Sequence, residues 1–179
     1  MNILTDRKNG IVKWSYNNKD ILIQNPSMIY AFEYGNEMVM LKLKNQDGKV
    51  EFSLYDVNGG FILSYSSHSD EITIGTYKSI QMNDLISVEY SKKDKKVIAL
   101  IGMRDEERKL VIMDYGGNII TNIINPPGYT FYSTKNIGNT ILVVCRGNSD
   151  VTRDKYGRND WSFRIDLDNY YAEKISVTQ

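Results

Sequence analysis

The sequence contains few of the residues on which disulfide frameworks, thiolate metal clusters and helices depend. Cys145 is the only cysteine and His68 the only histidine among the 179 residues. A single cysteine excludes an internal disulfide and any cysteine-based metal cluster. Only three alanines and three prolines are present. Because alanine is the best helix former and few segments space apolar residues three and four apart, we expect little or no helix.

The sequence also lacks an excess of charge and a long apolar run. Lys plus Arg and Asp plus Glu both number 22, so a general affinity for nucleic acid or for an anionic membrane is not indicated. No stretch approaches the roughly 18 apolar residues that span a bilayer. The first ten residues, MNILTDRKNG, lack the basic start and apolar segment of a secretory signal. We therefore expect a cytoplasmic protein with no membrane partner and no direct nucleic-acid partner.

Strand-forming residues are abundant, and they are arranged in a repeat. The thirteen tyrosines, with many isoleucines and valines, favour strands because such side chains pack well on a pleated surface. Residues 54–62 (LYDVNGGFI), 112–120 (IMDYGGNII) and 164–171 (RIDLDNYY) align as strand, Asp, turn, strand. The Asp accepts hydrogen bonds from nearby amides, and Gly or Asn adopts the positive φ of a tight turn. Each segment therefore predicts a β-hairpin.

A second pair of predicted strands lies upstream of each hairpin, so each repeat contains four antiparallel strands in sequence order. Such a meander is typical of a propeller blade. The units run over about 28–65, 85–124 and 130–177, with a lone hairpin at 10–24 and an extra strand at 71–74. The surplus strands would form a composite fourth blade or cover the edges of an open array. We predict a single all-β domain over 1–179, a small irregular β-propeller-like array of four-stranded antiparallel units; a β-sandwich is the alternative.

The predicted meander also sorts the connections between strands. Connections after the second and fourth strands emerge on one side of a sheet, and those after the first and third emerge on the other. The long connections 103–109 and 146–160 fall on the first side, whereas the other side has tight turns such as 58–60 and 116–118. Long loops on a rigid scaffold often carry binding sites, although 146–160 could instead be a mobile hydrophilic insertion. The predicted partner-binding residues are Arg104, Asp105, Glu106, Glu107, Arg108, Asp150, Arg153, Asp154, Tyr156, Arg158 and Asp160.

No set of residues in the sequence predicts catalysis, a cofactor or a metal. Residues 66–70 (SSHSD) place serines, His68 and an aspartate close together, but triad partners come from separate parts of a chain, and no strained nucleophile turn is present. Cys145 ends the apolar run 141–145, which predicts a buried side chain rather than a reactive thiol. Asp154 and Asp160 could form a catalytic carboxylate pair, but no motif supports this.

Two further patterns have simpler structural explanations. Asp166 and Asp168 alternate as calcium ligands do, but the glycine and the distant bidentate glutamate of a calcium loop are missing. The aspartate shared by the three hairpins is better explained by turn chemistry. Trp14 and Trp161 lie in similar contexts, and we expect both to pack within blades rather than to stack on nucleic-acid bases.

The overall pattern resembles the immunity proteins of bacterial contact-dependent inhibition and related polymorphic toxin systems. The resemblance rests on a short β domain with an irregular repeat and one elaborated face, most specifically on residues 109–128 and 160–179. It implies a non-enzymatic protein that binds one cognate toxin domain, in particular a nuclease, and covers its active site. Acidic side chains on the long loops would complement a basic nuclease site, although the interleaved arginines oppose that field. The alternative is a lectin-like β-propeller that binds a glycan or another small ligand.

Overall fold

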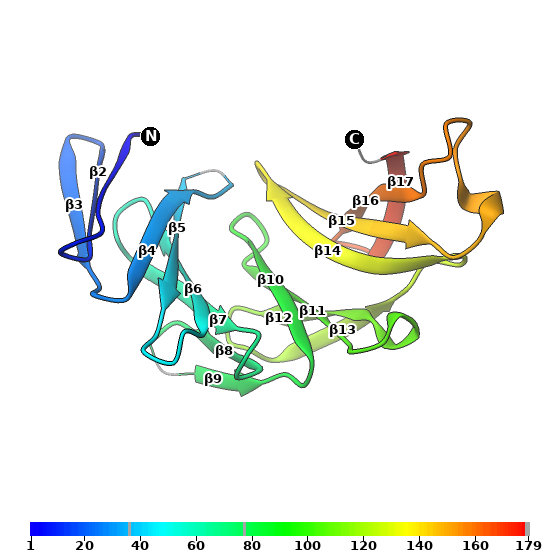
Figure 1. Cartoon of the computed structure of the whole chain (residues 1–179), viewed down its shortest axis with the longest axis horizontal. Coiled ribbons are helices and arrows are strands. Elements are labelled where there is room, and N and C mark those ends of the chain that lie inside the picture. Colours follow the sequence, from blue (N-terminus) through cyan, green and yellow to red (C-terminus); the bar gives the residue numbers. More distant parts are fainter. Residues whose placement is uncertain (36, 77, 178–179) are drawn as a thin grey trace. The chain divides into compact units, whose positions relative to one another are not determined.

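The computed structural model describes residues 1–35, 37–76 and 78–177, and it has the predicted all-β fold (Figure 1). The described strands form four antiparallel sheets. The helices in these ranges are two single 3-10 turns, η1 (Asp105–Glu107) and η2 (Asp150–Thr152). None of the described helices has the length and apolar composition needed to cross a membrane. The prediction of antiparallel units with almost no helix is therefore confirmed.

The chain divides into two compact units, Met1–Gln81 and a second that begins at Met82. Each unit contains two sheets and is described by itself. The prediction that 1–179 form a single domain stays a prediction.

The first unit contains a three-stranded and a six-stranded sheet. The smaller sheet has the order β1 (Ile3–Asp6), β2 (Ile11–Tyr16), β3 (Lys19–Gln24). The larger has the order β4 (Met28–Glu33), β5 (Met38–Lys44), β6 (Val50–Asp56), β7 (Phe61–Ser66), β8 (Glu71–Ile74), β9 (Lys78–Gln81). The predicted hairpin at 10–24 corresponds to β2 and β3. The extra strand at 71–74 is β8, which pairs with β7 and β9, so the described strands form no composite blade from β8 and the hairpin.

The second unit contains two four-stranded meanders. The first has the order β10 (Leu85–Ser91), β11 (Lys96–Ile101), β12 (Lys109–Asp114), β13 (Ile119–Ile124). The second has the order β14 (Tyr129–Ile137), β15 (Thr140–Gly147), β16 (Asp160–Asp166), β17 (Tyr171–Val177). Neighbouring strands follow one another along the chain, as predicted for 85–124 and 130–177.

The repeat is present in the backbone as well as in the sequence. In three sheets the first strand has a register shift near its start. These shifts lie between Met28 and Tyr30 in β4, Leu85 and Ser87 in β10, and Phe131 and Ser133 in β14. An extra residue at such a place bends the strand and increases its twist.

The three predicted hairpins close with the same turn chemistry. Oδ1 of Asp56 accepts hydrogen bonds from the backbone N of Asn58 (2.8 Å) and of Gly60 (3.0 Å). Asp114 and Asp166 accept turn amides in the same way. Hydrogen bonds from Asn169 hold the pKa of Asp166 below its ordinary value, since they stabilise the carboxylate. The shared aspartate is therefore a turn residue.

An apolar core lies between the two sheets of the second unit. Leu100 and Ile112 of one sheet, and Phe131, Val143 and Cys145 of the other, are completely buried in it. Burial raises the pKa of the Cys145 thiol to about 12, so the thiol stays protonated at neutral pH. The predicted role of Cys145 as a small buried apolar side chain is confirmed.

The first unit has its own core between β1–β3 and β4–β6. Val12, Trp14, Val39 and Leu41 are buried there. Nε1 of Trp14 donates a hydrogen bond to the backbone O of Val57 (2.7 Å), which satisfies the one polar atom of the buried indole. The prediction that Trp14 packs inside the fold is confirmed.

A carboxyl group is buried where β10 contacts β14. Glu89 is only 5% exposed, and its Oε1 accepts a hydrogen bond from Oγ1 of Thr134 (3.0 Å). Oγ of Ser87 lies 2.7 Å from the same Thr134 oxygen. Oε2 of Glu89 has no hydrogen-bond partner among the described residues. Burial raises the pKa of Glu89 to about 7, and the hydrogen bond from Thr134 only partly opposes this.

We expect the free energy of unfolding to fall between pH 5 and pH 8 because of Glu89. The folded state binds this proton more tightly than the unfolded state, in which the pKa is near 4.5. The stabilisation is therefore complete below pH 4.5 and is lost as the pH rises through 7. The two pKa values differ by an amount that corresponds to about 3 kcal/mol.

Urea unfolding of the wild type, Glu89→Gln and the exposed control Glu106→Gln at pH 5, 6.5 and 8 tests this expectation. Glu89→Gln should lose most of the pH dependence, whereas Glu106→Gln should keep it. A Glu89→Gln profile with the wild-type pH dependence would show that another group is responsible.

Candidate protein-binding site

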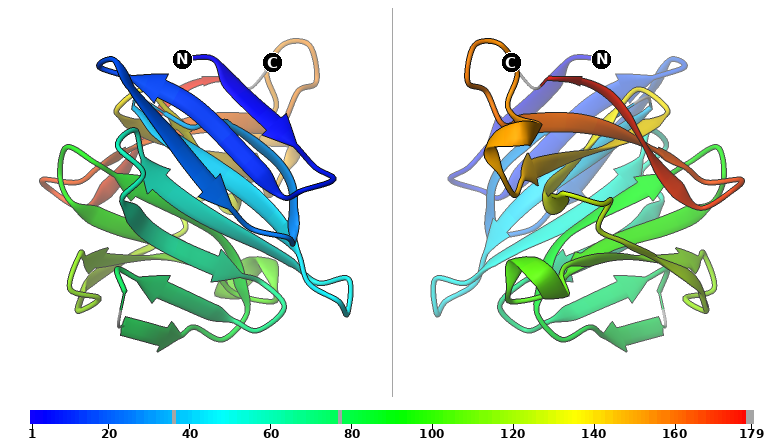
Figure 2. Two further views of the ribbon diagram at one scale, coloured as in Figure 1. Left: turned by 90° about the vertical axis from the view of Figure 1, so that its left-hand side faces the viewer. Right: turned by 90° about the vertical axis from the view of Figure 1, so that its right-hand side faces the viewer.

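The long connections of the second unit meet on one side of it. In Figure 2 (right), η1 (green), between β11 and β12, and η2 (orange), between β15 and β16, lie on the same side of this unit. Asn125 links the connections: its Nδ2 donates to the backbone O of Asp105 (3.1 Å), and its Oδ1 accepts from the backbone N of Phe131 (2.9 Å). The backbone N of Asn148 donates to the O of Gly128 (2.9 Å). Residues 102–108, 124–128 and 146–160 are called the loop face below.

All the predicted partner-binding residues lie on the loop face. The prediction that the long connections emerge together is therefore correct for the second unit. Whether these residues bind a partner stays a prediction.

The longest connection is held by its own hydrogen bonds. Oγ1 of Thr152 lies 2.6 Å from Oδ1 of Asn159, and Nδ2 of Asn159 donates to the backbone O of Gly147 (2.7 Å). Nε1 of Trp161 donates to the backbone O of Thr152 (2.8 Å). A Cβ at Gly147 would lie 1.9 Å from Oγ1 of Thr152, so this close packing needs glycine. The network favours an ordered loop over a mobile insertion.

A turn at the tip of this connection presents a tyrosine. Oδ1 of Asp154 accepts hydrogen bonds from the backbone N of Tyr156 (2.9 Å) and of Arg158 (2.8 Å). Desolvation raises the pKa of Asp154, but the hydrogen bonds from Arg158 and Tyr156 outweigh it and lower that pKa overall. Lys155 Nζ and Arg158 Cζ lie 4.9 and 5.3 Å from the centroid of the Tyr156 ring. Tyr156 is therefore held by its neighbours while its ring stays open to solvent.

Most acidic side chains of the loop face are paired with an arginine. The ion pairs are Asp105 with Arg108 (3.1 Å), Asp150 with Arg153 (2.8 Å), Asp154 with Arg158 (2.7 Å) and Asp160 with Arg146 (3.3 Å). Glu106 and Glu107 have no ion pair among the described residues. The predicted acidic field thus depends mainly on these two glutamates.

Sequence reasoning missed Tyr132, which lies against two arginines. Cζ of Arg146 lies 4.5 Å, and Cζ of Arg108 5.9 Å, from the centroid of its ring. Arg108 is largely buried, and its Nη1 donates a hydrogen bond to the backbone O of Phe131 (3.0 Å). This bond connects the loop after β11 to strand β14. Tyr132 lies at the register shift of β14, between Phe131 and Ser133, where the regular alternation of side chains is interrupted, so no sequence pattern pointed to its exposure.

The loop face carries the four most exposed large apolar side chains of the described residues. They are Val151 (92% exposed), Ile124 (76%), Met103 (74%) and Tyr156 (71%). Of these, the sequence prediction named only Tyr156. For Val151 and Met103 the signal is an apolar residue within a polar connection, whereas Ile124 is the last residue of β13 and has no such signal.

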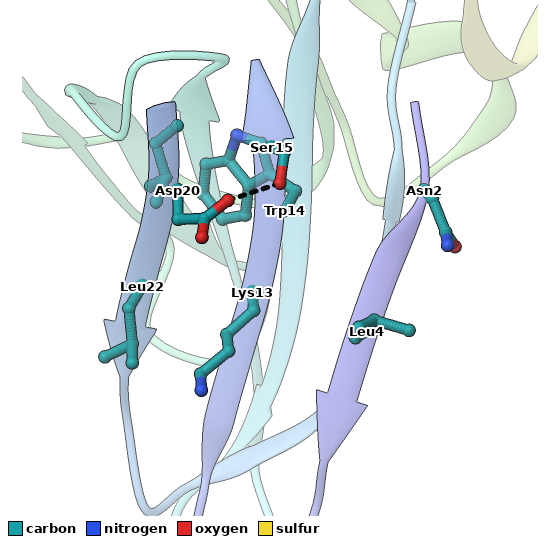
Figure 3. Close-up of a pocket in the computed structure, with 8 residues that line it drawn as sticks. Asn2, Leu4, Lys13, Trp14, Ser15, Asp20 and Leu22 are labelled. Carbon is teal, nitrogen blue, oxygen red and sulfur yellow. Dashed lines mark hydrogen bonds between the residues drawn. The ribbon is translucent and has the colours of Figure 1, made fainter. Parts of the chain in front are cut away.

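Two hollows differ in their relation to the predicted site. One, of about 650 Å³, lies in the loop face and is lined in part by Glu106, Pro126 and Arg146. The other, of about 370 Å³, lies on one face of the β1–β3 sheet and contains none of the predicted residues (Figure 3). Leu4 and Leu22 flank Lys13 there in a row across the three strands.

The residues considered as catalytic candidates lie in ordinary structural settings: Asp154 is in an ion pair with Arg158 and Asp160 with Arg146. His68 is exposed in the turn after β7, where its backbone N donates to Oγ of Ser66. Within the described ranges, no group of three or more His, Cys, Asp or Glu side chains is placed to hold a metal. The expectation that the chain is not an enzyme stays a prediction.

Comparison with known proteins gives a solved structure but no family. No family model and no curated protein matches the chain. Among solved structures, it is similar to the β-propeller domain of the Trilobed protease from Pyrococcus furiosus, which has an open velcro topology. The two share 13% sequence identity with a TM-score of 0.42, over 94% of this chain and 48% of that chain. The chain therefore spans about half the length of that structure.

We expect Thr152→Val to loosen the connection 146–160. The substitution keeps the side-chain shape but removes the hydroxyl bonded to Asn159, which should cost about 1–3 kcal/mol of local stability. Limited proteolysis followed by mass spectrometry should show faster cleavage within this connection. Thr140→Val, at an exposed strand start, is the control and should cleave at the wild-type rate. Equal cleavage of both variants would show that the hydroxyl does not hold the loop.

Proposed function

We propose that the chain is a non-enzymatic protein-binding module that contacts its partner through the loop face. The observation that carries the proposal is the exposure of Val151, Ile124, Met103 and Tyr156 on that one face. Exposed apolar side chains on preformed loops lose solvent contact when a partner covers them, and this burial is the main favourable term in association. Elsewhere on the described chain, exposed apolar residues are less accessible than these four.

The ion pairs around these side chains suit the rim of a protein interface. Each links an aspartate to an arginine that is close in sequence or on the neighbouring strand. In two of the four, Arg146 with Asp160 and Arg153 with Asp150, both side chains are solvent-exposed. Such pairs add little affinity by themselves, but they satisfy the charged groups before a partner arrives. The apolar side chains and Tyr156 then supply the contacts from which water is excluded.

We further propose that the partner is a cognate bacterial toxin domain, with a nuclease as the expected class, and that this chain is its immunity protein. The support is the resemblance described from the sequence together with Glu106 and Glu107, the glutamates of the loop face without an ion pair among the described residues. A nuclease site is basic because it binds phosphates, so two free carboxylates would favour association with it.

The direct test uses the toxin domain encoded by the reading frame next to this gene. The purified domain should form a 1:1 complex with the chain in size-exclusion chromatography, and its nuclease activity should fall to background at equal concentrations. The absence of a toxin frame, or full activity in the presence of the chain, would contradict the immunity proposal. A rise in melting temperature with simple sugars, and none with the toxin domain, would favour the glycan-binding alternative.

We expect Val151→Asp to weaken this complex. A carboxylate at the most exposed apolar position would have to be desolvated at the interface, so the dissociation constant should rise on the order of tenfold or more. Ile137→Asp is the matched control. Ile137 is an exposed apolar residue at the end of β14, whereas the loop-face residues 124–128 precede the start of that strand. Isothermal titration calorimetry measures both variants. Equal losses of affinity would remove Val151 from the interface.

Glu106→Lys should slow association more than it speeds dissociation. Rim charges act mainly on the encounter rate, and this reversal removes one of the two unpaired carboxylates of the loop face. Asp168→Lys makes the same change of charge in the tight turn between β16 and β17. Stopped-flow association at low salt should be several-fold slower for Glu106→Lys than for Asp168→Lys. The same rate for both variants would mean that Glu106 does not steer the encounter.

A further inference from the structure

The edge strands of the sheets differ in how they are protected against pairing with another chain. Each of the four sheets has two edge strands. β13 (Ile119–Ile124, IITNII) contains no charged residue. All the others except β10 contain at least one charged residue that is not buried, for example Lys19 and Asp20 in β3 or Glu173 and Lys174 in β17. The one carboxyl group of β10 is the buried Glu89, and this strand contacts β14. β13 therefore lacks the charge that commonly protects an edge; its register shift falls at Ile120, and residues 121–124 pair with β12 without interruption.

The apolar side chains of β13 are also unusually accessible for an edge strand. Ile119 is 60%, Ile120 42% and Ile124 76% exposed. β12 pairs with one side of β13, so the other side presents unpaired backbone N–H and C=O groups. Four isoleucines in six residues also give high strand propensity without proline.

The position of β13 connects this edge with the loop face. Its last residue, Ile124, pairs with Lys109 and is itself one of the exposed residues of that face. The next residue, Asn125, bonds both Asp105 and Phe131 and lines the hollow there. A partner seated on the loop face is therefore adjacent to the open edge of β13.

We propose that the protein partner adds an extended segment to β13 as a fifth strand of the β10–β13 sheet. This inference rests on the proposed protein-binding function and names the way in which the partner is held. Main-chain hydrogen bonds to β13 contribute affinity, and contacts with Ile119, Ile120 and Ile124 select a segment with apolar side chains. Lysines or arginines opposite these isoleucines would be disfavoured, because β13 offers no counter-charge to them.

The experiment compares two substitutions that each add a lysine to an edge strand, one on β13 and the control on β17. Ile120→Lys places a charge on β13, and Ile175→Lys places one on β17 at a similarly exposed isoleucine, 48% against 42%. The probe is the same toxin domain. Its dissociation constant should rise on the order of tenfold for Ile120→Lys and stay within about twofold for Ile175→Lys. Asn122→Lys, at an exposed polar position of β13, replaces Ile120→Lys if that variant does not fold.

Hydrogen–deuterium exchange distinguishes strand addition from side-chain contact. On complex formation, the slowing of amide exchange should extend along 119–124, because the outward N–H groups become bonded. Binding that weakens with Val151→Asp but shows neither this protection nor an effect of Ile120→Lys would overturn the inference and leave the proposed function intact. No binding by the wild type would overturn both. A dimer of the chain alone that Ile120→Lys abolishes would assign the edge to a second copy and overturn the partner strand.

Discussion

The packing of the β10–β13 sheet against the β14–β17 sheet is the constraint from which the rest of the second unit follows. Strands β11 and β12 are buried on both faces, so neither can shift along its neighbours without exposing apolar side chains. This fixed register sets where each strand ends and therefore where the connections leave the sheet. The loops contribute little to this core, and they are free to be polar and long.

Much of the fold could be predicted because its signals are local. The aspartate, glycine and asparagine of each hairpin determine their turn within a few residues, and the repeat of a strand pair followed by such a hairpin predicted the order of each four-stranded meander. β8 and β9 also pair with their neighbours in sequence, but they lie outside the aspartate hairpin repeat, so the repeat did not place them in the β4–β9 sheet. Charged loops were easy to find, but polar composition directed attention to Asp105 and Asp150 and away from Val151 and Met103.

On the loop face, arginines close in sequence offset the charge of most of the aspartates. Asp105 and Arg108, Asp150 and Arg153, and Asp154 and Arg158 are three or four residues apart, and in each case the loop brings the opposite charges together. Counting acids in the sequence therefore overstates the field that a partner meets. Binding of the proposed partner would then depend more on shape and apolar contact than on attraction over long distances, and it should be only moderately sensitive to salt.

The register shifts near the start of β4, β10 and β14 restrict where the length of this chain can change. Deleting the additional residue from any one of them would turn every following side chain of that strand to the opposite face. Gains and losses of residues are tolerated only where no such alternation has to be kept, which is in the connections. The connections 102–108 and 146–160 can thus change in length in descendants of this sequence while the strands keep theirs.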